Sequence, residues 1–241
     1  MGSLFYNLGK KVGPKVRRAK WIWQSITASE VEIIKAEYEV GRDLATEIRN
    51  RLEIDTYPKA GQMLNKVGRD LSACVANELR IFSFEVIKGN KPNAFALPGG
   101  FIFVTRSLLD LCDWKTDEIA FILGHEMAHV IRGHAMDRII TNSAIAVGSR
   151  TAHIRGLLAS WLGRVGVKFL QSAYSQDTEL EADKLGARLI AAAGYDSHAP
   201  IQLLSRLSKL KQSHDQSILG NYFSSHPNFD TRINNLDRLR S

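Results

Sequence analysis

The sequence is poor in cysteine and has no long apolar run, and its first 29 residues contain no acidic residue. Two cysteines, Cys74 and Cys112, cannot build a disulfide framework in a chain of 241 residues. We expect both to be small buried apolar residues, which suits a reducing compartment. No stretch free of Asp, Glu, Lys and Arg reaches the roughly 18 residues that a membrane-spanning helix needs. The sequence therefore predicts no such helix.

The charge of the chain is unevenly placed. The chain carries 32 basic and 25 acidic residues, and six of the basic residues lie within residues 1–29. The remainder is therefore close to neutral, and no extended basic surface for nucleic acid is expected. The N-terminus also lacks the pattern of a secretory signal, because its bases follow its short apolar stretch. The predicted location is cytoplasmic or peripheral to a membrane.

Residues 1–29 combine those bases with apolar residues that include Trp21 and Trp23. A basic amphipathic segment of this kind can lie on an anionic membrane surface. The alternative is an arm that packs across the body of the protein. Residues 139–174 are apolar but interrupted by four glycines, which is typical of a mobile lid or of a second membrane-surface segment. We expect residues 30–241 to form one domain.

The spacing of apolar residues predicts a mainly helical domain with a small sheet. Helices are expected over residues 30–53, 58–78, 106–112, 117–133, 176–194, 199–212 and 229–240, with helical pieces in 139–174. One strand is expected within residues 80–89, and two short strands within 94–105 should join at Pro98-Gly99-Gly100. A small sheet set among many helices is an α+β domain.

The stretch HEMAH, residues 125–129, places His125 and His129 four residues apart in a predicted helix. Residues at this spacing lie on one helical face about 6 Å apart, so both imidazoles can bind one ion. Zinc binds imidazole well, and a catalytic zinc needs three protein ligands with a fourth position open to water. Glu126 points about 100° around the helix and can take a proton from that water. The pattern predicts half of a zinc site.

Two stretches compete to supply the third ligand. His134 is expected at or beyond the end of the helix, as a surface residue or as a partner of a ligand. The stretch ELEAD, residues 179–183, places Glu179 and Asp183 on one helical face, with Glu181 pointing elsewhere. Glu179 would complete a set of two histidines and one glutamate. Asp183 could then accept a hydrogen bond from a ligating imidazole and fix its tautomer.

These stretches together resemble metallopeptidase family forty-eight. HEMAH followed by a glutamate in an E-x-x-x-D stretch is similar to the zinc motif of that family. NAFALPGG, residues 93–100, resembles its Asn-Ala strand before the zinc helix, and SSHPNFDTRINNL, residues 224–236, resembles its His-Pro and Arg-Ile element. Because some members carry membrane-spanning helices and none is predicted here, the soluble OMA-like branch of the family is the closer analogy.

The resemblance implies a zincin-like fold of the gluzincin type, with one zinc ion per chain held by His125, His129 and Glu179. It also implies that His226 and Arg232 help to bind the substrate or the oxyanion of the transition state, which carries negative charge.

A peptide substrate needs a surface that holds it in an extended form beside the zinc. Residues 93–104 suit an edge strand, and added backbone pairing at Asn93, Ala94 and Phe95 would hold an extended peptide there. An ordinary hairpin would show the same sequence pattern.

The sequence thus predicts a zinc-dependent endopeptidase that hydrolyses protein or peptide substrates, in the setting of protein quality control. One rival is a latent or non-catalytic member of the fold that acts as a chaperone or binding module. A second rival is a structural zinc site whose fourth position is filled by protein.

Overall fold

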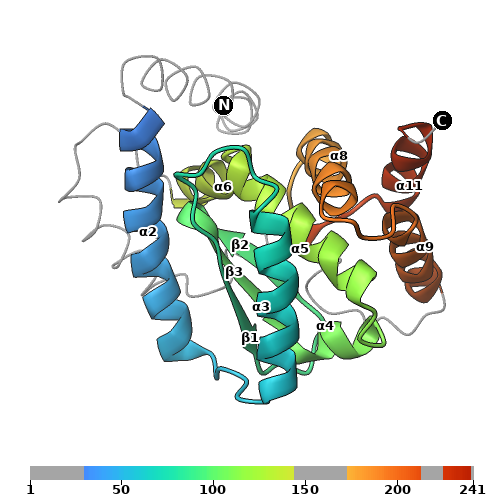
Figure 1. Ribbon diagram of the computed structural model, residues 1–241, viewed down its shortest axis with the longest axis horizontal. Coiled ribbons are helices and arrows are strands. Elements are labelled where there is room, and N and C mark those ends of the chain that lie inside the picture. The colour runs from blue at the N-terminus through green and yellow to red at the C-terminus, as the bar shows by residue number, and fades with distance from the viewer. Residues whose placement is uncertain (1–29, 144–172, 213–224, 240–241) are drawn as a thin grey trace, which may run out of the picture.

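The computed structural model describes residues 30–143, 173–212 and 225–239. Within these ranges, helices surround one three-stranded sheet, so the predicted α+β architecture is confirmed (Figure 1). The predicted basic segment 1–29 and most of the predicted segment 139–174 lie outside the described residues. Among the helices that the structure describes, none is both long and apolar enough to cross a membrane.

The sheet consists of β1 (Ser83–Ile87), β2 (Ala94–Leu97) and β3 (Phe101–Thr105), in the order β1-β3-β2. β1 runs parallel to β3, whereas β2 is antiparallel to it. The turn between β2 and β3 is a short 3-10 helix, η1 (Pro98–Gly100), in which Gly99 and Gly100 have φ of 72° and 94°. Glycine adopts such positive φ values without steric cost. In the order β1-β3-β2, β2 is an edge strand, as predicted for residues 93–104, whereas β3 within the same range is the central strand.

Both faces of the sheet are buried against helices. Helix α2 (Glu30–Arg51) packs on the face that carries Phe95, Leu97 and Phe103. Helix α3 (Pro58–Ser72) packs on the opposite face, with residues such as Ala96 and Ile102. Successive side chains of a strand point to opposite faces, which explains why β2 is apolar at every position and β3 at every position except Thr105.

Helix α3 is shorter than predicted, because it ends at Ser72 and not near residue 78. Beyond that point the backbone turns: Cys74 N–H donates to Leu71 O, and the side chain of Asn77 accepts a hydrogen bond from Leu79 N–H. Asparagine competes with helical bonding through this kind of local contact. Cys74 is only partly buried, whereas Cys112 is fully buried and burial raises its thiol pKa to about 12.

The remaining helices are α4 (Arg106–Leu111), α5 (Thr116–Ile131), α6 (His134–Ser143), α8 (Gln176–Ala192), α9 (Ala199–Gln212) and α11 (Phe229–Arg238). Helix α5 lies between the sheet and α8 and is buried on all sides from Glu118 to Val130. A helix that is apolar all round belongs in the interior of a domain. Gly133, with φ of 76°, separates α5 from α6. His134 therefore begins a new helix, which the sequence pattern does not indicate.

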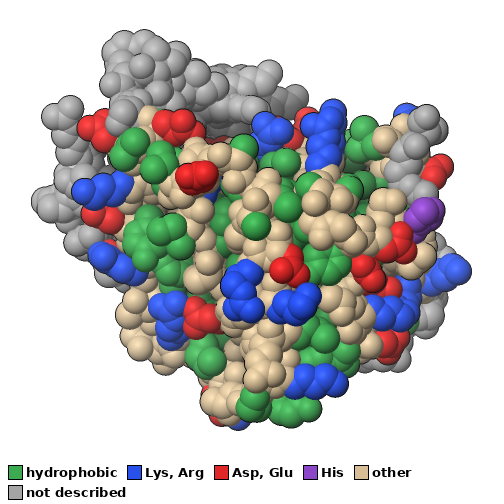
Figure 2. Space-filling model, in the orientation of Figure 1, with side chains coloured by type: hydrophobic (Ala, Val, Ile, Leu, Met, Phe, Trp, Pro, Cys, Tyr) green, Lys and Arg blue, Asp and Glu red, His purple; other side chains and the backbone are tan. Residues whose placement is uncertain are grey.

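The surface charge agrees with the near-balanced composition of the body. On the face shown in Figure 2, basic and acidic side chains are interspersed and form no large patch of one sign. This face offers no extended basic surface of the kind that nucleic acid binds.

Candidate metal centre

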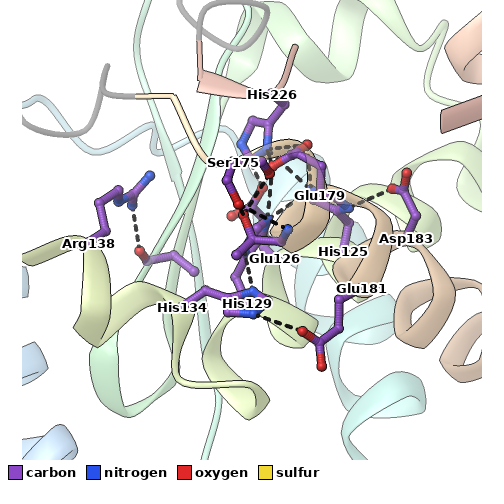
Figure 3. Close-up of polar contacts among 12 residues, drawn as sticks. His125, Glu126, His129, His134, Arg138, Ser175, Glu179, Glu181, Asp183 and His226 are labelled. Carbon is purple, nitrogen blue, oxygen red and sulfur yellow. Dashed lines mark hydrogen bonds and ion pairs between the residues drawn. The ribbon is translucent and has the colours of Figure 1, made fainter. Parts of the chain in front are cut away.

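The predicted metal-site residues come from three parts of the chain that meet where α5 packs against α8. His125, Glu126 and His129 lie on α5, Glu179 on α8, and His226 on the segment before α11 (Figure 3). All five are fully buried. Two glycines allow the helices to approach closely at this level.

Those glycines are Gly124 on α5 and Gly186 on α8. A Cβ atom placed on Gly186 would lie 2.9 Å from the backbone nitrogen of His125. One placed on Gly124 would lie 3.1 Å from the carbonyl oxygen of Gly186. The two backbones are therefore in contact, and this contact holds the histidines of α5 opposite the carboxylate of α8.

Four side chains point one ligand atom each into a common centre: His125, His129, Glu179 and His226. His125 Nε2 lies 3.1 Å from His129 Nε2 and 3.2 Å from His226 Nδ1. Glu179 lies 3.4 Å from His129 Nε2, through Oε1, and 3.6 Å from His125 Nε2, through Oε2. Ligands at about 2.0–2.1 Å from one tetrahedral ion stand about 3.3 Å apart. The donor set and its spacing therefore fit a zinc-sized ion.

Glu179 also belongs to a buried network of opposite charges. Arg232 on α11 lies 2.8 Å from Glu179 Oε2, and it donates two hydrogen bonds of 2.7 Å to Asp183. Burial opposes ionisation of Glu179, but His226 and Arg232 outweigh it and hold its pKa well below the usual range. Burial likewise opposes ionisation of Asp183, and Arg232 again lowers the pKa. Both carboxylates therefore favour the ionised form, in which a carboxylate binds cations.

The two histidines of α5 have different electrostatic surroundings. Burial and Arg232 would lower the pKa of His125, but Glu179 and Asp183 outweigh them and raise it. Burial lowers the pKa of His129 well below its usual value. Asp183 Oδ1 lies 2.8 Å from His125 Nδ1. This contact directs the other ring nitrogen, Nε2, to the centre of the cluster, which is the arrangement predicted for Asp183.

Glu126 lies beside the cluster without being one of its four donors. Neither of its carboxylate oxygens makes a hydrogen bond within the described part of the chain, although both are buried. Its Oε1 lies 3.4 Å from His226 Nε2. A buried carboxylate held next to a metal centre can accept a proton there.

His226 and Arg232 both lie at the cluster, and their predicted contact with the substrate or the oxyanion stays a prediction. A catalytic zinc needs a fourth position open to water, but His226 Nδ1 lies among the donors, 3.0 Å from Glu179 Oε1. Arg232 is fully buried behind Glu179 and pairs with two carboxylates. The geometry thus gives Arg232 a role in holding the ligand carboxylate. Its contact with a substrate stays a prediction.

His134 and Glu181 form a second contact next to the cluster (Figure 3). His134 Nδ1 lies 3.1 Å from His129 Nδ1, and its Nε2 lies 3.4 Å from Glu181 Oε2. Neither residue is among the four donors. His134 therefore supports a predicted ligand from behind, and Glu181 faces away from the centre.

Tyr174 is a residue of the site that the sequence analysis misses. Its ring stacks on the imidazole of His129 with centroids 3.9 Å apart and an angle of 15° between the planes. The guanidinium of Arg138 lies 4.5 Å from the centre of the same ring. The Tyr174 hydroxyl is buried and has no hydrogen-bond partner among the described residues, and burial raises its pKa. No spacing rule identifies such a residue, because it precedes α8 in an irregular segment.

The edge strand presents its backbone rather than its side chains. Thr105 N–H donates to Asn93 O, so the antiparallel alternation turns the backbone of Phe95 to β3 and those of Ala94 and Ala96 outwards. The Phe95 ring stacks on Phe103 within the core. Arg138 from α6 already donates to Ala96 O at 3.1 Å. The side-chain amide oxygen of Asn93 is buried without a hydrogen-bond partner among the described residues.

Known peptidases have sequences similar to this chain. The model of peptidase family M48 matches residues 58–240. The mitochondrial metalloendopeptidase OMA1 of Arabidopsis thaliana is 33% identical over 154 residues, which cover 63% of this chain and 30% of that protein. The same-named protein of Schizosaccharomyces pombe is 26% identical over 200 residues, covering 81% and 57%. The metalloprotease LoiP of Escherichia coli is 30% identical over 150 residues, covering 60% and 57%. The chain thus spans between 30% and 57% of the length of these curated relatives.

Proposed function

The chain belongs to peptidase family M48, and from this premise we propose that it is a zinc-dependent endopeptidase acting on protein substrates. The observation that carries the proposal is the convergence of His125, His129 and Glu179 on one centre, with Glu126 beside it. The relatives are named metalloendopeptidases or metalloproteases. We place the activity in protein quality control, where unfolded proteins are the substrates.

Each residue of the site has a distinct task in this proposal. His125, His129 and Glu179 hold the metal, and Asp183 and Arg232 orient two of these ligands through the contacts described above. A zinc ion held there would polarise the scissile carbonyl and acidify a water molecule. Glu126 accepts the proton of that water and passes it to the leaving amine.

The substrate would lie along β2 as an added strand. The outward backbone groups of Ala94 can pair with an extended peptide, which gives affinity with little side-chain selectivity. The side-chain amide of Asn93 is placed beside the same edge. A peptide that also pairs at Ala96 has to displace Arg138 from its carbonyl oxygen.

One observation favours the alternative of a latent or non-catalytic member of the fold. His226 supplies a fourth donor to the cluster, and a tetrahedral zinc with four protein ligands has no position for water. In the active state that we propose, His226 leaves this position and stabilises the oxyanion of the transition state.

The substitution His226→Ala tests whether His226 is a fourth ligand of the metal or a residue that stabilises the oxyanion. If His226 acts on the oxyanion, the variant should retain one zinc per chain and lose about 10²–10³-fold in kcat, the usual effect of removing such a donor. The measurements are metal content by mass spectrometry and the rate of casein hydrolysis. A variant that is more active than the wild type would show that His226 blocks the site, and loss of zinc would show a structural ligand.

The identity of the third ligand is tested with two neighbouring glutamates of α8. Glu179→Gln should release the metal, because an amide replaces the ligating carboxylate, whereas Glu181→Gln should retain it. Metal content of both purified variants beside the wild type is the measurement, with casein hydrolysis before and after chelation as the functional readout. Full zinc content in Glu179→Gln would refute the ligand set, and activity that survives complete chelation would refute a metallopeptidase.

A further inference from the structure

Exposed apolar side chains gather at one place on the described surface. Six large apolar residues are strongly exposed within the described ranges, and four of them line one hollow of about 200 Å³. These four are Val31, Tyr38, Leu79 and Ile81, with exposed fractions of 55%, 38%, 50% and 67%. Single exposed apolar residues are normal, but a cluster around a hollow is the usual form of a binding surface. We call this hollow the α2 groove.

The α2 groove has firm walls. Its floor includes Arg80, whose Nη1 donates to Glu37 Oε2 at 2.9 Å and to Val130 O at 3.4 Å. Gly99 closes one side, with no room for a side chain, because a Cβ there would lie 2.4 Å from the Cα of Tyr38. The groove is therefore held open by packed backbone and a buried ion pair, and its apolar rim faces solvent.

We propose that the α2 groove is the docking site for residues 1–29 of the same chain. The segment joins the described chain at Glu30, one residue before Val31, which lines the groove. Trp23 lies seven residues before Glu30, and seven residues reach up to about 24 Å. The groove extends along α2 only from Val31 to Tyr38, about 10 Å. The tryptophans of the segment can therefore fold back onto the groove without strain in the connection.

The short connection, rather than charge, favours the chain's own segment as the occupant of the groove. Residues 1–29 carry six basic and no acidic residues. The charged residues that line the groove are also basic, Lys35 and Arg80, and Arg80 is paired with the buried Glu37. A segment tethered this closely also experiences an effective concentration in the millimolar range. This tethering favours the chain's own segment over a second copy or a lipid surface as the partner of the exposed apolar residues.

The proposal is tested by the accessibility of the segment to trypsin, which cleaves after its lysines and arginines. The substitution Ile81→Asp places a charge in the groove at a residue that is 67% exposed, so the fold is retained. Cleavage after Arg18 and Lys20 should be about ten-fold faster in this variant, which corresponds to about 1.4 kcal/mol of docking free energy. Leu239→Asp is the matched control, because Leu239, like Ile81, is an exposed aliphatic residue but lies outside the groove. Its cleavage rate should equal that of the wild type.

All chains in this experiment carry Glu126→Gln, so that no self-cleavage contributes and the result is independent of the proposed peptidase activity. Equal cleavage rates in wild type and Ile81→Asp would overturn the proposal. Protection that grows with protein concentration would overturn it in favour of a second copy. Protection that occurs only on phosphatidylglycerol vesicles would overturn it in favour of a membrane surface.

Discussion

Replacing Glu126 with glutamine is expected to lower kcat for casein hydrolysis by about 10²–10⁴-fold, the usual contribution of a general base, and to leave the metal content unchanged. Glutamine has nearly the same shape as glutamate, so the buried space is filled as before. It cannot accept the proton of the attacking water. Glu126 is not one of the four clustered donors, so its loss removes no ligand.

The matched control for this prediction is Glu181→Gln, which makes the same chemical change on a residue that faces Arg132 and His134 outside the donor cluster. Its activity should stay near that of the wild type. If Glu126→Gln remained fully active, the role of proton acceptor would belong to another group. If it lost its metal, Glu126 would act in holding the ligands.

Replacing Arg232 with leucine is expected to lower the free energy of unfolding of the metal-free protein by about 3–5 kcal/mol, the cost of breaking a buried ion pair. Leucine leaves two fully buried carboxylates, Glu179 and Asp183, without their shared cation. Their pKa values, which Arg232 helps to lower, should then rise. Urea unfolding in the presence of a chelator measures the loss.

The pH dependence of Arg232→Leu follows from the same carboxylates. A lowered pKa in the folded state contributes stability above the pKa of the unfolded group, near 4, and this stability is lost as the pH falls through the folded value. The wild type should therefore lose stability as the pH falls below about 4, and the variant should lose less over that range. Arg51→Leu, which breaks an exposed pair with Glu47, should cost less than about 1 kcal/mol. Equal losses in both variants would contradict a stabilising role for Arg232.

The local part of the site could be predicted from sequence because its spacing is fixed by helical geometry. His125, Glu126 and His129 belong to one helix, so their relative directions follow from 3.6 residues per turn. The ligand on α8 required pairing two distant segments. The chemistry of a two-histidine, one-glutamate zinc site favoured Glu179, and the resemblance to a known family supported that choice.

Other features depend on contacts that no local pattern encodes. The position of His226 among the donors depends on how the segment before α11 returns to α5, and the stacking of Tyr174 on His129 depends on an irregular segment before α8. The parallel pairing of β1 with β3 joins strands that the sequence only marks as apolar. The end of α3 at Ser72 is followed by backbone turns, such as Cys74 N–H to Leu71 O, that the sequence pattern does not mark.

The contact between Gly124 and Gly186 has a consequence for the choice of ion. Because main-chain atoms of the two ligand helices touch there, the width of the ligand cage is set by the backbone and not by side-chain packing. Substitutions that change side-chain volume elsewhere in the core should therefore leave the distance between the ligand helices unchanged. We therefore expect the crossing of these two helices to disfavour ions larger than zinc, such as calcium with ligand distances of about 2.3–2.6 Å.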